Sequence, residues 1–174
     1  MKIRSLLLLE VLLTALLASL SFVHHPSGDI VDVAISSSDH TTLVAAVKSA
    51  GLVQTLKGKG PFTVFAPTNA AFERLPAGTV ETFLKPESKP QLTRLLTYHV
   101  VPGKLDATSI LKAIRKGNGQ TTLTTVSGGK LTAGLSGNQV LLTDESGNLA
   151  TVTTTDLKAS NGIIHVIDRV VLPN

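Results

Sequence analysis

The sequence contains no cysteine and no tryptophan, and it has a single tyrosine among 174 residues. Without cysteine, thiol catalysis, thiolate metal sites and disulfide bonds are all excluded. Aromatic residues make up only 3% of the chain, so aliphatic side chains must fill the core. The hydrophobic content of 43% is enough for one packed core, and the length corresponds to one domain. No motif in this composition points to covalent chemistry.

A concentrated basic surface is also missing. The formal net charge is only +4, and the densest basic group is Lys112, Arg115 and Lys116. Binding of nucleic acid usually needs a continuous basic face with stacking aromatic residues. We therefore expect no nucleic-acid partner, whereas mild attraction to anionic surfaces or polysaccharides is compatible with this charge.

The N-terminus has the pattern of an export signal. The basic stretch Met1–Arg4 precedes an apolar run from Leu6 to Val23, and Ser19–Ser21 offers small residues for cleavage. This pattern predicts a secretory signal peptide over residues 1–23, cleaved near residue 21. We therefore expect a secreted protein, either extracellular or periplasmic.

A membrane anchor is the alternative interpretation of the apolar run. A bilayer span needs about 20 predominantly apolar residues, and Glu10 interrupts this run. We expect no stable membrane span after cleavage. Residues 24–28 are predicted to be a linker, and residues 29–174 to be the folded domain.

Helical spacing dominates the first half of the chain. Leu43, Val44 and Val47 share one helical face, and Gly51 is placed to end that helix. The apolar strand Phe62–Ala66 then stops at a proline, after which Thr68 can cap a short helix. Further helices are predicted around residues 80–84, 92–96 and 107–116 from apolar residues at spacings of three and four.

From Gln120 onward the pattern changes to strands. Threonine, valine and leucine alternate between turns rich in serine, glycine and asparagine, which predicts four strands of a meander. A final strand, Ile163–Leu172, is apolar on both faces and should lie centrally in its sheet. Tyr98–Val101 is predicted as one more short strand. Helices followed by strands indicate an α+β domain.

Three blocks of this sequence are distinctive. They are Pro61–Leu75 (PFTVFAPTNAAFERL), Thr97–Gly103 (TYHVVPG) and Asn161–Pro173 (NGIIHVIDRVVLP). In this order and spacing they resemble the fasciclin-like domain family (beta-Ig-H3/fasciclin), over roughly Asp29–Asn174. The single short domain resembles small secreted bacterial members. The resemblance implies a compact β-sandwich of about seven strands, with several helices packed along one side.

The resemblance also implies candidate partner-binding residues. Adhesion proteins of this family carry a Tyr-His pair in the second block, which is Tyr98-His99 here. Animal members also use an Asp-Ile pair before the last block, and the matching position here reads Asp156-Leu157. The apolar neighbours of Tyr98-His99 suggest burial, which would give that pair a structural role instead of a contact role.

Catalytic residues do not assemble in the sequence. No Gly-x-Ser-x-Gly nucleophile turn is present. His165 and Asp168 are three apart on a predicted strand, so their side chains point to opposite faces. A hydrolase would require distant residues such as His99 and Asp156 to converge. We predict that the protein is not an enzyme and has no cofactor.

Metal ligation is not predicted either. His24-His25 are interpreted as part of a solvated linker, and His40 as part of a loop or helix cap. The turn Asp144–Asn148 offers oxygen ligands, but it lacks the alternating donors and the distal glutamate of a calcium loop. We interpret it as a solvated hairpin turn.

The sequence therefore predicts a secreted or cell-surface, non-catalytic binding module for cell adhesion or association with the extracellular matrix. Its partner would be a protein receptor or another cell-surface or matrix component, with a glycan as a further option. The alternative is an extracellular protein that binds a small molecule or polysaccharide in a pocket between the helices and the sandwich. Such a pocket would be apolar with a few convergent polar groups.

Overall fold

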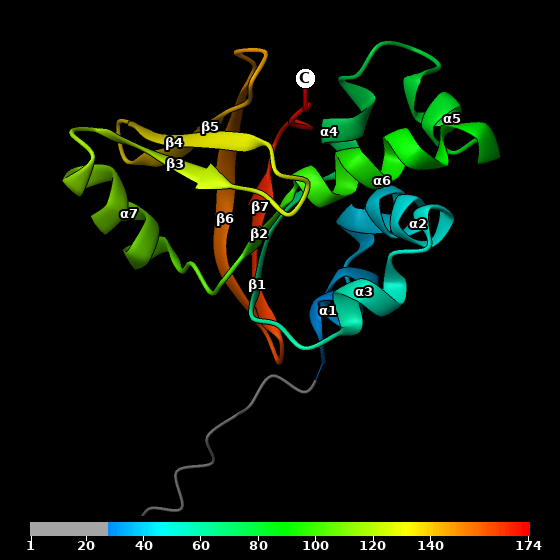
Figure 1. Cartoon of the computed structure of the whole chain (residues 1–174), viewed down its shortest axis with the longest axis horizontal. Coiled ribbons are helices and arrows are strands. Elements are labelled where there is room, and N and C mark those ends of the chain that lie inside the picture. Colours follow the sequence, from blue (N-terminus) through cyan, green and yellow to red (C-terminus); the bar gives the residue numbers. More distant parts are fainter. Residues whose placement is uncertain (1–27) are drawn as a thin grey trace, which may run out of the picture.

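The computed structural model describes residues 28–174 (Figure 1). The predicted signal peptide and nearly all of the predicted linker lie outside the described residues. The helices are α1 (Ile30–Ile35), α2 (Thr41–Ala50), α3 (Val53–Lys57), α4 (Asn69–Glu73), α5 (Thr79–Phe83), α6 (Lys89–Tyr98) and α7 (Ala107–Lys116), with 3₁₀ turns at Ser38–His40 and Pro86–Ser88. The strands are β1 (Phe62–Pro67), β2 (Val100–Pro102), β3 (Gln120–Thr124), β4 (Lys130–Ser136), β5 (Gln139–Thr143), β6 (Leu149–Ala159) and β7 (Gly162–Ile167). Within residues 28–174, no helix is both long enough and apolar enough to cross a membrane.

Capping residues set the helix boundaries. The carboxylate of Asp29 accepts hydrogen bonds from two amides in the first turn of α1. Thr68 and Asp106 each accept one such amide at the start of α4 and α7. Gly51 ends α2 in the left-handed conformation, which glycine adopts without a Cβ clash. The helix ends predicted at Thr68 and Gly51 are confirmed.

The strands form one continuous sheet in the order β2-β1-β7-β6-β5-β4-β3. The β1–β7 pair is parallel and joins residues 62–67 to residues 162–167, whereas the other pairs are antiparallel. All six residues of β7 are buried, and it lies between β1 and β6. The prediction of a central last strand is confirmed, although this strand ends at Ile167 and not at Leu172.

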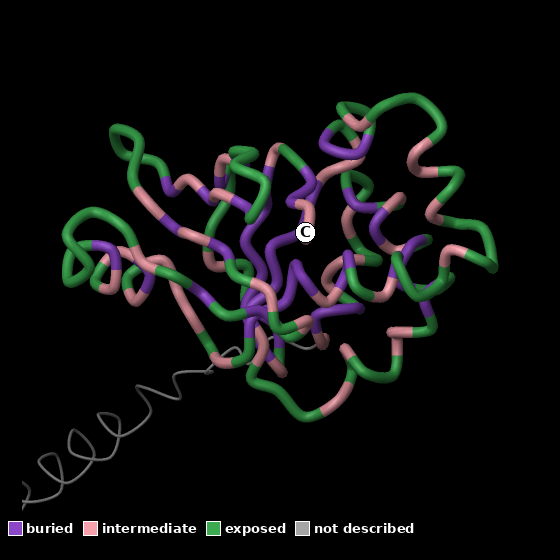
Figure 2. Tube along the Cα trace, turned by 45° about the horizontal axis from the view of Figure 1, so that its top comes forward, coloured by how far each residue is buried: buried purple, intermediate pink, exposed green. Residues whose placement is uncertain are grey.

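Two apolar cores lie on opposite faces of the β1–β7 pair, and buried residues concentrate along these strands (Figure 2). Val64 and Ala66 of β1 face the core formed with α1, α2, α4 and α6. Phe65, between them, faces the core formed with α7 and the β3–β6 meander. Because successive side chains of a strand point to opposite faces, one strand contributes to both cores.

The helices are therefore divided between the two faces and do not all lie on one. α7 packs against β3 and β4, on the opposite side of the molecule from α1 to α6 (Figure 1). The predicted α+β fold with seven strands is confirmed. The strands β3, β4 and β5 cross the upper part of β6 and β7 in Figure 1, within the same hydrogen-bonded sheet. The sandwich arrangement stays a prediction.

The prediction of a strand beginning at Tyr98 is wrong. Helix α6 continues through Tyr98, and β2 begins only at Val100. Leu92, Leu95 and Leu96 are buried at helical spacing, and Tyr98 is buried with them. The apolar face of the helix therefore continues through Tyr98, where the sequence pattern predicted a strand.

Asn161, in the turn before β7, connects the N-terminal helices to the sheet. Its side-chain Oδ1 accepts the amide of Ile30 at 3.0 Å, while its Nδ2 donates to the carbonyls of Leu56 at 2.7 Å and Gly58 at 3.0 Å. Its own carbonyl accepts the amide of Phe62 at 3.1 Å. One side chain thus fixes the start of α1 and the end of α3 against the β1–β7 pair.

We expect Asn161→Ala to lower the free energy of unfolding by about 2–4 kcal/mol, because three side-chain hydrogen bonds are lost together. Urea denaturation measures this change. Asn138→Ala is the matched control, since Asn138 is exposed in the β4–β5 turn. It should change stability by less than about 0.5 kcal/mol. Equal effects of the two substitutions would contradict the assigned role of Asn161.

Candidate functional site

Tyr98 is fully buried at the end of α6, with 0% of its surface exposed. Its ring belongs to the core shared with α7 and the meander. The hydroxyl donates to the carbonyl of Lys130 at 2.7 Å and accepts the amide of Glu145 at 3.2 Å. Burial raises the pKa of Tyr98 to about 12, so the phenol stays neutral at physiological pH. Tyr98 therefore ties α6 to β4 and to the β5–β6 turn.

His99 is 2% exposed and makes two hydrogen bonds inside the protein. Nδ1 donates to the carbonyl of Leu95 at 2.8 Å, and Nε2 accepts the amide of Val171 at 3.3 Å. This pattern requires the neutral imidazole with its proton on Nδ1. Burial lowers the pKa of His99 to about 4. The ring therefore links α6 to the C-terminal segment.

The predicted burial of Tyr98-His99 is confirmed. Both side chains have their polar atoms engaged by groups of the protein, which gives them a role in holding the fold. A partner would reach them only after local opening. Direct contact of this pair with a partner stays a prediction.

The turn after β5 is a hairpin whose residues 145–148 are exposed, as predicted, but its first residue, Asp144, is buried. Asp144 is 5% exposed, and its carboxylate accepts the amides of Ser146, Asn148 and Leu172 as well as the side-chain amide of Asn148. These N–H donors occupy the oxygens that a cation would need. Residues 28–174 contain no group of three or more histidine and acidic side chains that could hold a metal ion. Asp144 thus anchors the turn to the C-terminal segment through the amide of Leu172.

Asp156 lies at an irregular point of β6. The β6–β7 register shifts between Thr154 and Leu157, and Asp156 has a positive φ of 61°. Its carboxylate accepts the amide of Ala107 at 2.9 Å, at the start of α7, and its own amide donates to Nδ1 of His165 at 3.3 Å. Asp156 is thus held by α7 and β7 together.

His165 completes this arrangement on β7. Its Nδ1 accepts from Asp156, so Nε2 carries the proton and donates to the carbonyl of Leu105 at 2.7 Å. The ring stacks on Phe65 at a centroid separation of 5.6 Å. Asp156 therefore meets His165, whereas both ring nitrogens of His99 are engaged elsewhere. The convergence of His99 with Asp156 that a hydrolase would need is not observed.

Leu157 is the most accessible of the four candidate residues, with 36% of its surface exposed. It follows Asp156 on the part of β6 that extends beyond β5, because β5 pairs only with residues 149–151 of β6. Among the described strands, none pairs with this outer edge of residues 153–159. The candidate pair Asp156-Leu157 thus lies on β6, beside an open strand edge.

Two apolar cavities lie against adjoining faces of α1, between the helices and the sheet. The larger has a volume of about 240 Å³ and is lined by residues that include His40, Ala34 and Leu157. The narrower has a volume of about 80 Å³ and lies among α1, α2 and α3, with His99 in its wall. Ala34 lines both cavities.

His40 is the functional candidate that sequence reasoning missed. It lies at the N-cap position of α2, as the prediction of a loop or helix cap allowed, but its side chain is 5% exposed and makes no cap hydrogen bond. Nδ1 is hydrogen-bonded to the hydroxyl of Ser37 at 2.8 Å, whereas Nε2 is buried without a partner. Burial lowers the pKa of His40, against opposing effects of Asp39 and the Ala66 carbonyl. Its burial depends on β1, which the local sequence does not reveal.

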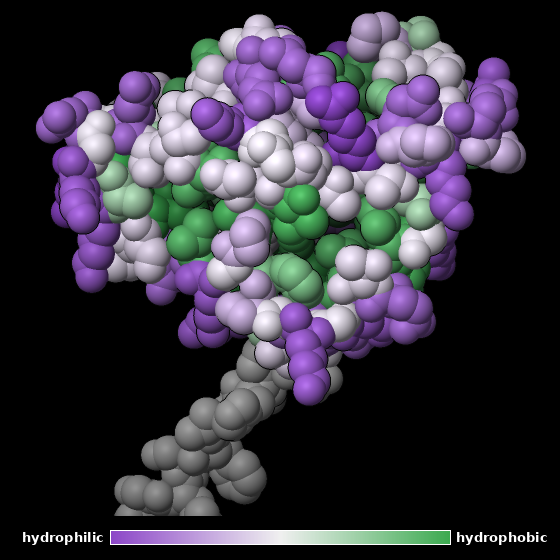
Figure 3. Space-filling model, in the orientation of Figure 1, coloured by the Kyte–Doolittle hydropathy of each residue, from purple (hydrophilic) through white to green (hydrophobic). Residues whose placement is uncertain are grey.

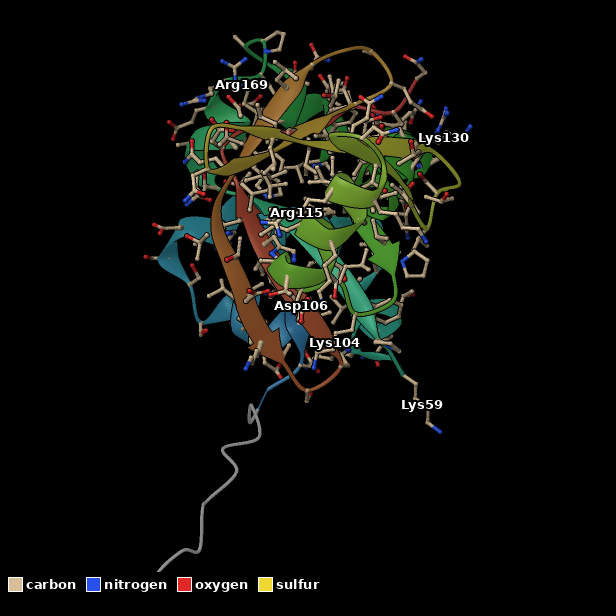
Figure 4. The ribbon with its side chains drawn as sticks, turned by 90° about the vertical axis from the view of Figure 1, so that its left-hand side faces the viewer. Lys59, Lys104, Asp106, Arg115, Lys130 and Arg169 are labelled. Atoms are coloured by element: carbon tan, nitrogen blue, oxygen red, sulfur yellow. The ribbon has the colours of Figure 1, made fainter. Side chains whose placement is uncertain are left out.

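One face of the molecular surface carries a band of apolar residues. An apolar band crosses the middle of the face in Figure 3 and is bordered above and below by polar residues. Charged side chains on the α7 side are spread along the face and are not gathered (Figure 4). Lys104, Arg115 and Lys130 are separated there, and Asp106 lies among them.

The lowered pKa of His99 predicts a pH dependence of stability. In the unfolded chain the His99 imidazole binds a proton at about pH 6.5, whereas in the folded protein it binds the proton only at about pH 4. Stability should therefore fall by about 3 kcal/mol as the pH decreases from 6.5 to 4. Urea denaturation of the wild type and of His99→Gln measures it, and the variant should show a weaker dependence. A His99 ring that titrates near pH 6.5 by NMR would contradict this prediction.

Asp156 should act as a structural residue through its side-chain oxygen and its backbone conformation. We expect Asp156→Ala to lower the free energy of unfolding by about 1–3 kcal/mol, because the amide of Ala107 loses its acceptor and alanine disfavours positive φ. Asp156→Asn retains both features and should change stability by less than about 0.5 kcal/mol. Thermal unfolding followed by circular dichroism compares the two variants. Equal losses would show that the charge itself is needed.

Comparison with known proteins agrees with these features. The Fasciclin domain family model matches residues 38–173. Protein sll1483 of Synechocystis sp. is 49% identical over 144 residues, which cover 83% of this chain and 73% of the relative. Transforming growth factor-beta-induced protein ig-h3 of Sus scrofa is 34% identical over 148 residues, covering 85% of this chain and 20% of that protein.

The fold also matches a solved structure, described as a FAS1 domain pair from the insect cell adhesion molecule Fasciclin I. The TM-score is 0.74 at 17% sequence identity, covering 84% of this chain and 51% of the other. The chain thus spans about half of that domain pair. With a family match over most of the described residues and a relative that is 49% identical, the chain belongs to the fasciclin domain family.

Proposed function

We propose that this protein is a secreted or cell-surface, non-catalytic binding module that mediates cell adhesion or association with the extracellular matrix. Membership of the fasciclin domain family supports this function, and the solved relative Fasciclin I is described as a cell adhesion molecule. The basic, apolar N-terminal sequence supports export. The partner is a protein receptor or a matrix component.

The observation that carries the proposal is the Asp156-Leu157 pair, in which Leu157 is exposed and Asp156 is partly buried. Hydrogen bonds to Ala107 and His165 fix the backbone of Asp156, so the neighbouring Leu157 is presented from a rigid position. A rigid apolar side chain beside an acid is suited to recognition, because little conformational freedom is lost on binding. The pair also corresponds to the acidic and aliphatic pair that the family resemblance implies.

The open edge of β6 gives such a partner a second means of attachment. Residues 153–159 pair on one side with β7 and offer backbone groups on the other. An extended segment of a partner protein can add to such an edge as a further strand. Backbone pairing would provide affinity, and Leu157 with Asp156 would provide specificity.

Tyr98 and His99 serve this function indirectly. They fasten α6 to the meander and to the C-terminal segment, and so hold the sheet on which the contact pair lies. Their substitution would lower binding through loss of stability.

A second candidate function is supported by the two cavities beside α1. An extracellular carrier of a small molecule would need an apolar pocket between the helices and the sheet, which is where these cavities lie. Solvent extraction of the protein purified from its native source, followed by mass spectrometry, tests whether it retains such a molecule. The two candidate sites share Leu157, which is exposed at the surface and also lines the larger cavity.

The adhesion proposal predicts saturable binding of the purified secreted protein to a component of cell-surface extracts, which biolayer interferometry measures. Asp156→Asn and Leu157→Ser should each weaken this binding at least about 10-fold while the melting temperature stays the same. Such a loss corresponds to about 1.4 kcal/mol, as expected for a residue central to an interface.

Leu135→Ser is the matched control, because Leu135 is a comparably exposed leucine of β4, at 42%. It should leave binding unchanged. A glycan panel tested in parallel covers the polysaccharide option. Binding that is unaffected by both Asp156→Asn and Leu157→Ser would reject the proposed contact surface, and binding to glycans alone would reject a protein receptor.

A further inference from the structure

The larger cavity has the features of a ligand site and is formed by segments from distant parts of the sequence. Val33 and Ala34 come from α1, Ala66 from β1, Leu157 from β6 and Ile164 from β7. Its volume of about 240 Å³ exceeds the roughly 150 Å³ of an engineered apolar cavity that binds benzene. The space is therefore sufficient for a ring or short chain with a small head group.

The lining carries no charged side chain. Its two serine hydroxyls are already engaged, since Ser36 donates to the carbonyl of Val33 at 2.7 Å and Ser37 pairs with Nδ1 of His40 at 2.8 Å. Burial of an ionised ligand without a partner of opposite charge is strongly unfavourable. The chemistry of the wall therefore selects a neutral occupant.

One polar atom of this wall is unsatisfied. Nε2 of His40 is buried and makes no hydrogen bond of normal geometry, although the Ala66 carbonyl interacts with the ring and opposes the lowering of its pKa. An unpaired buried polar group is unfavourable in the free protein, and a ligand that pairs with it recovers that free energy. His40 itself forms part of the lining of this cavity. Because the proton of the neutral ring resides on either nitrogen, a hydroxyl group can pair with Nε2 as donor or acceptor.

The narrower cavity differs from the larger one in its volume, in the charge of its lining and in the hydrogen bonding of its histidine. It is about 80 Å³ in volume, and Lys48 and Lys57 lie in its lining. The polar atoms of its histidine, His99, are both engaged. It therefore offers less room, and it contains no unsatisfied group that would orient a ligand.

We infer that the larger cavity binds a neutral amphiphile, a molecule with a compact apolar body and a single hydroxyl group that pairs with Nε2 of His40. The inference rests on the second proposed function, that the protein carries a small molecule, and it specifies the class of that molecule. Leu157 forms part of the wall, so an occupant would also pack against the Leu157 side chain of the contact pair.

Three ligands that share one ring test the inference on the wild-type protein. They are benzyl alcohol, toluene and benzoate, which differ only in having a neutral polar group, no polar group or a charged group. Long-range ¹H–¹⁵N correlation spectra follow the imidazole nitrogens during each titration. Benzyl alcohol should shift the His40 signals with a dissociation constant on the order of 1 mM.

Toluene should bind about 3–10-fold more weakly than benzyl alcohol, because it cannot pair with Nε2. Benzoate should bind at least about 10-fold more weakly still. The rings of His99 and His165 are internal controls, since their nitrogens are engaged within the protein, and their signals should not move.

Two variants separate the contribution of the ligand's hydroxyl group to binding from the contribution of the cavity space. His40→Phe should weaken benzyl alcohol binding to the level of toluene, without weakening toluene itself. Ala34→Leu should fill the space and abolish binding of both ligands, whereas Ala45→Leu, exposed on α2, should leave both unchanged. If His40→Phe does not fold, the three titrations of the wild type still decide the question.

Each contrary result has a distinct meaning. Equal affinity for toluene and benzyl alcohol, or tighter binding of benzoate, would overturn the ligand class while leaving a carrier function in place. Shifts confined to residues of the narrower cavity would overturn the assignment of the site. Absence of binding by all three ligands would overturn the inference, and a protein that also yields no extracted molecule would overturn the carrier function.

Discussion

The fold depends on the parallel pairing of β1 with β7, strands that lie about 100 residues apart in the sequence. Both strands are buried on two faces, so each contributes to a core on either side. Asn161 fixes the register where the pair begins, because it also binds the ends of α1 and α3. This pair therefore forms only after both distant segments are present. The remaining elements are arranged around it.

The position of α7 follows from the same constraint. The helix packs on the meander, away from the other helices, and its first turn meets Asp156 through the amide of Ala107. This contact coincides with the irregularity of β6 and with the open edge next to it. The irregular part of β6 thus contacts the start of α7 and carries the residue pair that we propose as the contact site.

Burial separates the four candidate residues into two roles. Tyr98 and His99 have their hydrogen-bonding atoms engaged inside the protein, whereas Leu157 is exposed at a fixed position. Local sequence indicated the burial of the first pair, because apolar residues flank it. It gave no sign that Asp156 supports α7 or that Leu157 and His40 line one cavity, since these contacts join segments far apart in the chain.

By itself, the sequence determined the α+β class, the central last strand, the caps at Gly51 and Thr68, and the family, because spacing and capping chemistry are local properties. Only the tertiary structure decided that α6 includes Tyr98, that Asp144 is buried under four N–H donors, and that α7 lies apart from the other helices. It also decided which buried histidine lacks a partner. Burial and hydrogen-bond satisfaction depend on which distant segments meet, and this is set when β1 and β7 pair.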